Sequence, residues 1–105
     1  MFEDRERGYE AKWAHDAETL FRMRARRDTR LGEWAAARMD LHDSVIDDYV
    51  AAVVEAGMSG KTPDPVLEKI RADFQAKGVT CSDADLQAQA NSQRAEAEEH
   101  FRPKT

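Results

Sequence analysis

The sequence predicts an all-α protein, a four-helix bundle with a long first helix and a mobile N-terminal segment. Apolar residues recur at helical spacing in four successive stretches. Residues that commonly start or stop helices flank the last three of these stretches. No stretch shows the apolar and polar alternation of a half-buried strand. Together these patterns favour helices packed around one core.

The first stretch, residues 2–39, holds both tryptophans, nine of the sixteen basic residues and no proline. At 100° per residue, its apolar members fall within about one third of the helix circumference. They are Phe2, Tyr9, Trp13, Ala17, Leu20, Met23, Leu31, Trp34 and Ala35. Before residue 20 these side chains stand isolated among charges, and Gly8 costs about 1 kcal/mol relative to alanine. We therefore expect 1–19 to be a segment that becomes helical against a partner, and 20–105 to form the bundle.

A second helix is predicted over about 44–56, with Asp43 as its N-terminal cap. Gly57 is expected to adopt the left-handed conformation that ends a helix, and Met58 to contact Val53 across that end. This stretch is the most apolar of the four, so we expect it at the centre of the core. Residues 57–63, with two glycines and a proline, form the predicted linker to the third helix.

Two further helices have clear boundaries in the sequence. Asp64 can cap the third helix, and Pro65 suits its first position, where no backbone N–H is needed. Gly78 is expected to end that helix in the left-handed conformation. The fourth begins after Ser82, whose spacing to Asp85 resembles a capping box.

The charge distribution argues for internal rather than external pairing. The chain has a formal net charge of −5, which disfavours nucleic acid as a default partner. Residues 20–38 carry six arginines and two acids, whereas residues 41–105 carry seven basic and twelve acidic groups. We therefore expect a basic first helix to pack against acidic later helices. No secretory signal pattern or apolar run of membrane-spanning length is present, so the prediction is a cytoplasmic or peripheral protein.

The sequence predicts no catalytic residue, no metal site and no cofactor. The three histidines are far apart, and no phosphate-binding glycine loop or nucleophile elbow occurs. Cys81 is the single cysteine, which excludes an intramolecular disulfide, and is expected to be an ordinary thiol. The acidic pairs Asp47–Asp48 and Glu98–Glu99 are interpreted as solvated faces, because adjacent helical residues point about 100° apart.

An alternative function follows from three arginines of the first helix. Arg22, Arg26 and Arg30 recur at i, i+4 and i+8, so they line one side of a helix and could hold a phosphate. On this reading the chain is a small helical module that binds adenine nucleotide, ADP or ATP.

Two other arginines fall inside the apolar stripe of the first helix. A charge at Arg24 or Arg27 must reach solvent or be paired. The preferred interpretation is a structural ion pair, with Arg27 in a binding surface as the other. The candidate acids are Asp47, Asp48 and Asp73.

A set of short motifs runs through the first stretch: Phe2, Asp4-Arg5-Glu6, Glu10, Lys12, Ala14-His15-Asp16, Glu18, Phe21, Ala25-Arg26-Arg27, Leu31-Gly32 and Trp34-Ala35-Ala36. In these motifs the chain resembles the zeta subunit of alphaproteobacterial ATP synthases, a family first catalogued as a domain of unknown function. A weaker similarity continues through Tyr49, Val53, Val66, Lys69-Ile70, Asp73-Phe74 and Gly78. The resemblance implies a four-helix protein whose mobile N-terminal segment enters the catalytic F1 head and blocks rotation in the hydrolysis direction.

Carried over by position, the resemblance makes residues 1–19 the inhibitory segment. Its contact candidates are Phe2, Asp4, Arg5, Glu6, Tyr9, Glu10, Trp13, His15 and Asp16. It implies a non-enzymatic regulator that binds catalytic and rotor subunits of the F1 head, in the cytoplasm and peripheral to the inner membrane through ATP synthase. It implies no direct membrane insertion. A structural or stress-related bundle with another partner is the remaining alternative.

Overall fold

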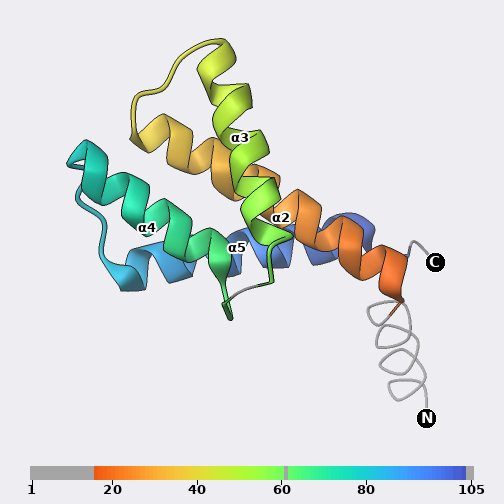
Figure 1. The fold of residues 1–105 in the computed structure, drawn as a ribbon. Helices are drawn as coiled ribbons and strands as arrows, with labels where there is room; N and C mark the ends of the chain where they lie inside the picture. The colour runs from red at the N-terminus through yellow and green to blue at the C-terminus, as the bar shows by residue number, and fades with distance from the viewer. Residues whose placement is uncertain (1–15, 61, 104–105) are drawn as a thin grey trace.

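A computed structural model describes residues 16–60 and 62–103, and within these ranges it contains four helices and no strand. The helices are α2 (Ala17–Arg38), α3 (Ser44–Gly57), α4 (Pro65–Lys77) and α5 (Asp83–Phe101), drawn in Figure 1. The all-α class and the four-helix architecture are therefore confirmed. Of the segment 1–19, which the sequence predicts to be mobile, residues 1–15 lie outside the described residues.

The longest helix, α2, is the scaffold on which the others assemble (Figure 1). It packs most extensively against α3 and α5, while α4 lies mainly on α3. The chain reverses direction at each connection, so that α5 runs back along α2. Arg26 near the start of α2 thus pairs with Glu96 near the end of α5, and Arg38 at the end of α2 donates a hydrogen bond to the Thr80 carbonyl just before α5.

The core lies where the helices meet around the second half of α2. Its buried members are Leu31, Ala35, Met39, Val53, Val66, Leu67, Ile70, Phe74, Leu86 and Ala90. The expectation that the second predicted helix forms the centre of the core is wrong. Only Val53 of α3 is buried, and Val45 is 50% exposed, whereas α4 buries four side chains. The apolar composition of α3 overestimates how many of its side chains are buried, because α3 has α2 and α4 on one side and solvent on the other.

The start of α2 lies inside the first stretch of helical spacing, residues 2–39. Asp16 is extended, with ψ 127°, and α2 begins at the next residue. Its side chain accepts a hydrogen bond from the backbone N–H of Thr19, which satisfies one of the donors that the first helical turn leaves free. α2 therefore begins at Ala17, within the segment 1–19 that the sequence predicts to order on a partner.

Both predicted ends of α3 need correction, although its position is confirmed. Asp43 has φ 56° and its side chain makes no capping hydrogen bond to the helix. Gly57 is the last helical residue rather than a left-handed terminator, and Met58 is 62% exposed instead of packing on Val53. Gly57 instead meets another helix, since a Cβ there would collide with the Asp28 carboxylate and crowd a methyl group of Val66.

The boundaries of α4 and α5 are confirmed. Asp64 accepts a hydrogen bond from the Leu67 N–H at 3.3 Å, and Ser82 accepts one from the Asp85 N–H at 3.0 Å. Gly78 adopts φ 70° directly after α4, a conformation in which a Cβ would be strained.

Candidate functional site

The predicted partner-binding segment meets the bundle at Asp16. Of the nine contact candidates, Asp16 is the one within the described residues. The other eight, from Phe2 to His15, lie in 1–15 and stay predictions. The described part of the site is therefore the N-terminal end of α2, with the groove and ion pairs that surround it.

Asp16 holds the junction between the segment and the bundle. One carboxylate oxygen, Oδ2, accepts hydrogen bonds from the backbone N–H and the hydroxyl of Thr19, each at 3.0 Å. These bonds keep the pKa of Asp16 below its ordinary value, because they stabilise the ionised carboxylate. The negative charge also lies at the positive end of the α2 dipole. Asp16 thus has a structural role in starting α2, whatever it contacts on a partner.

The next turn of α2 is open to solvent. Arg22 and Glu18 form an ion pair at 2.6 Å, with both side chains more than half exposed. Phe21 is 58% exposed, whereas Trp34 packs against the core with its ring 5.6 Å from that of Phe74. Phe21 is thus a large aromatic side chain that is mostly exposed to solvent, directly after the predicted inhibitory segment. This exposure distinguishes the turn from the rest of α2.

The structure does not favour a phosphate site at the three arginines predicted for nucleotide binding. Arg22 is paired with Glu18, and Arg26 makes three hydrogen bonds to the Glu96 carboxylate, the shortest at 2.6 Å. That hydrogen bonding raises the pKa of Arg26 and lowers the pKa of Glu96. Arg30 also stabilises the Glu96 charge. Because acids of the chain itself pair with Arg22 and Arg26, the geometry does not favour the nucleotide alternative.

A groove of about 620 Å³ separates the first half of α2 from α5 and from the connection between α3 and α4. Its lining includes Leu20, Met23, Arg27, Asp64, Ala90 and Asn91. Charges of both signs occur along it, and Arg22, Arg26 and Arg30 do not line it. The groove therefore has no surplus of positive charge that would select an anion.

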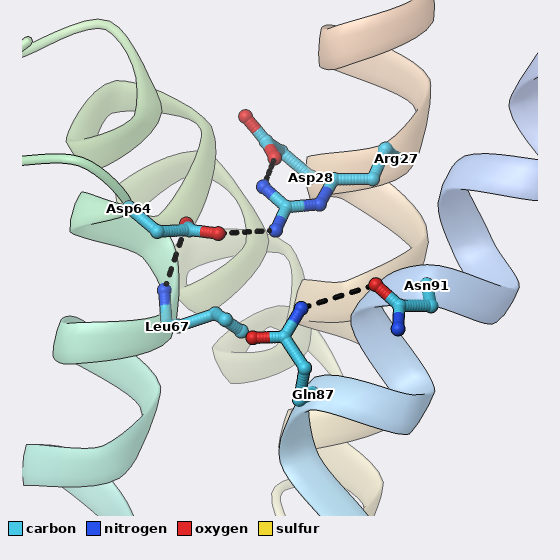
Figure 2. A network of polar contacts seen from close by, with 6 residues as sticks. All are labelled: Arg27, Asp28, Asp64, Leu67, Gln87 and Asn91. Atoms are coloured by element: carbon cyan, nitrogen blue, oxygen red, sulfur yellow. Dashed lines mark hydrogen bonds and ion pairs between the residues drawn. The ribbon is translucent and has the colours of Figure 1, made fainter. Parts of the chain in front are cut away.

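Arg27 joins two parts of the fold at the edge of this groove, as Figure 2 shows. Its guanidinium donates to Asp28 at 3.0 Å and to Asp64 at 2.8 Å. Asp64 caps α4 with its other carboxylate oxygen, which accepts from Leu67. Burial alone would lower the pKa of Arg27, but the bonds to the two acids raise it above the ordinary value. Arg27 thus ties α2 to the start of α4.

Arg27 forms a structural ion pair, as predicted, but the acids predicted as its partners are wrong. Asp47 and Asp48 are exposed on α3. Asp73 accepts a hydrogen bond from the Tyr49 hydroxyl at 2.9 Å and pairs with Lys69 at 3.1 Å. Burial, followed by the bond to Asp73, raises the pKa of Tyr49. Asp73 therefore joins α4 to α3 rather than to α2.

Asp28 is the buried charged residue of this network, with 6% of its surface exposed. Its carboxylate lies against Gly57 at the C-terminal end of α3, where the helix dipole is negative. Burial raises the pKa of Asp28, and Arg27 opposes that shift. The sequence does not single out Asp28, because its burial depends on Gly57, which approaches from another helix.

The stability of the fold is expected to depend on pH through Asp28. Because the folded-state pKa is raised, the folded protein binds this proton more readily than the unfolded chain does. Protonation of Asp28 therefore stabilises the folded state. This stabilisation is fully present below the unfolded-state pKa of Asp28 and is lost as pH rises through its folded-state pKa. The free energy of unfolding of the wild type, relative to that of Asp28→Asn, should therefore fall as pH increases from about 4 to 7. Urea unfolding over this range measures it, and a constant difference would contradict it.

No other group in the described ranges forms a chemical site. Cys81 is half-buried beside the core, and its thiol donates to the Ser82 carbonyl at 3.6 Å. Residues 16–60 and 62–103 contain no cluster of histidine, cysteine, aspartate or glutamate that could hold a metal ion. In the same ranges no helix is long and apolar enough to span a bilayer.

Comparison with known proteins gives one match that covers almost the whole chain and one that is partial. The chain is 34% identical over 89 residues to a 1D-myo-inositol 2-acetamido-2-deoxy-alpha-D-glucopyranoside deacetylase of Corynebacterium kroppenstedtii. That alignment covers 81% of this chain but 23% of the deacetylase, so it carries no assignment of activity. No solved structure matches the chain. The model of the family described as ATPase inhibitor subunit zeta matches residues 1–100, and the chain belongs to this family of ATPase inhibitors.

Proposed function

We propose that this protein is a non-enzymatic regulator of ATP synthase that inhibits ATP hydrolysis by the F1 head. The observation that carries the proposal is the family match, which spans both the N-terminal segment and the bundle. The inhibitor inserts residues 1–19 between catalytic subunits and blocks rotation in the hydrolysis direction. It works in the cytoplasm and is peripheral to the inner membrane through its partner.

The described structure supports a division between an inserting segment and a supporting bundle. Asp16 caps the first turn of α2 with its own side chain. The buried cluster draws its members from all four described helices. An amphipathic segment attached to such a support can bind a groove on a partner as a helix. Its ordering on binding reduces affinity and permits release.

Two variants test the role of the segment in ATP hydrolysis by purified F1. The first lacks residues 1–15 and keeps Asp16, so that the cap on α2 is retained. The second is the full chain with Phe2, Tyr9 and Trp13 replaced by alanine. We expect the full wild-type chain to inhibit and both variants to lose inhibition, because the apolar contacts of the inserted helix are gone.

Far-UV circular dichroism and thermal unfolding serve as the control for these variants, since both should keep the four described helices. If the chain without residues 1–15 inhibits as strongly as the wild type, insertion of the segment is not the mechanism. If the wild type itself neither binds F1 nor inhibits it, the proposed partner is wrong.

A further inference from the structure

Three residues at the N-terminal end of α2 form an exposed apolar face. Ala17, Phe21 and Ala25 stand at i, i+4 and i+8, so they lie in one row along the helix, called here the α2 ledge. Phe21 is 58% exposed, Ala17 is exposed, and Ala25 is half-buried. The row contains no charged side chain, although α2 carries six arginines.

The ledge is uncovered because α3 is shorter than α2. The same face of α2 continues to Asp28 and Gly32, where α3 packs on it. Gly32 lies against Val50 and Val53, and Asp28 lies against Gly57, the last residue of α3. The ledge begins where this contact ends, and in Figure 1 the first part of α2 extends past α3. Over this part α2 contacts α5 through another face, on which Arg26 pairs with Glu96.

The shape of the ledge suits a helical partner. The small side chains of Ala17 and Ala25 leave both sides of the Phe21 ring open along the row. Rows of side chains four residues apart form the ridges that fit the grooves of a neighbouring helix. A fully buried phenylalanine removes roughly 150–250 Å² from water, and more than half of the Phe21 surface is still exposed for a partner to cover.

We propose that the α2 ledge is the bundle's share of the interface with the F1 head, with Phe21 as its anchor against an apolar, helical surface of that partner. The inference rests on the proposed function. Ala17 belongs both to the segment 1–19 and to α2. At 1.5 Å of rise per residue, Phe21 lies about 3 Å along the helix axis beyond residue 19. A partner surface that holds the segment to its end therefore reaches Phe21.

Phe21 does not contribute to the core of the protein. Its ring lies outside the buried cluster and outside the set of side chains packed on that cluster. Two other large hydrophobic side chains, Val45 and Met58, are 50% and 62% exposed, but they belong to α3 and its C-terminal cap rather than to α2. Phe21 differs from both because it continues the predicted inhibitory segment along the chain.

The test is inhibition of ATP hydrolysis by full-length variants, titrated against purified F1. Phe21→Ala removes the anchor, Phe21→Leu keeps an apolar side chain, and Val45→Ala is the matched control at another exposed position. We expect Phe21→Ala to raise the concentration for half-maximal inhibition about tenfold. Phe21→Leu should restore most of the potency, and Val45→Ala should match the wild type. Thermal unfolding should not distinguish the four proteins, because both sites are exposed.

The outcomes separate this inference from the proposed function. If Phe21→Ala inhibits like the wild type while the triple alanine variant of Phe2, Tyr9 and Trp13 does not, the ledge is no part of the interface and the inhibitory segment stands. If the triple variant also inhibits like the wild type, both proposals fail. Gel filtration adds a third result, since a wild-type dimer that Phe21→Ala dissociates, with unchanged inhibition, would assign the ledge to a second copy of the chain and overturn the inference.

Discussion

Replacing Arg27 with methionine is expected to lower the free energy of unfolding by about 3 kcal/mol near neutral pH. Methionine keeps the apolar stem but removes a guanidinium that bonds to Asp28 and Asp64. Asp28 then stays buried against the end of α3 without its cation. Its protonation relieves part of the cost at low pH, so the loss should be larger at neutral pH than near about pH 4.

Two comparisons make the result for Arg27 specific. The double variant Arg27→Met with Asp28→Asn should recover part of the lost stability, because it removes the uncompensated charge. Arg94→Met removes an arginine whose side chain is 76% exposed and which pairs with Glu98, so it should cost less than about 0.5 kcal/mol. Urea unfolding of the four proteins provides the values. Equal losses for Arg27→Met and Arg94→Met would show that the bridge between α2 and α4 contributes no more than a surface pair.

The second large effect is expected at Phe74, whose replacement by alanine should cost about 3–5 kcal/mol. The side chain is 3% exposed, and its ring lies 5.6 Å from that of Trp34. Alanine leaves a cavity between α2 and α4 that the surrounding helices cannot fill completely. Since a small domain has a total stability of about 5–15 kcal/mol, this change removes a large share of it.

Tryptophan fluorescence and urea unfolding check the Phe74 prediction. In a Trp13→Phe background Trp34 is the single tryptophan, so its emission reports the environment next to position 74. The variant should shift that emission to longer wavelength and unfold at lower urea. Phe21→Ala, which removes an exposed ring of the same size, should stay within about 0.5 kcal/mol of the wild type. A Phe74→Ala variant as stable as Phe21→Ala would contradict the assignment of the core.

Local signals in the sequence were sufficient for the helices and for several of their ends. Asp64, Gly78 and Ser82 act within a few residues of their own positions, as an N-cap hydrogen bond or a left-handed backbone requires. The same reasoning failed at Asp43 and Gly57. At Gly57 the requirement comes from Asp28 on another helix, and distance along the chain hides it.

The candidate site divides in the same way. Charge counts along the chain predict that a basic first helix pairs with acids on later helices, and the bonds from Arg26 to Glu96 and from Arg27 to Asp64 confirm it. The choice of Asp64 over Asp73 could not be predicted, because it depends on where the connection after α3 places the start of α4. The start of α2 after Asp16 has a local signal, an acid three residues before Thr19, but the apolar spacing that runs across this position does not mark it.

By itself the sequence determined the helical class, the four helices and the family, because periodicity, capping and motifs are properties of neighbouring residues. Only the tertiary structure decided which apolar side chains are buried and which charges meet. The helices differ in length, so α3 covers α2 as far as Asp28 and leaves Phe21 in solvent. Whether a side chain is buried depends on the residues that pack against it, and those residues are distant in the sequence.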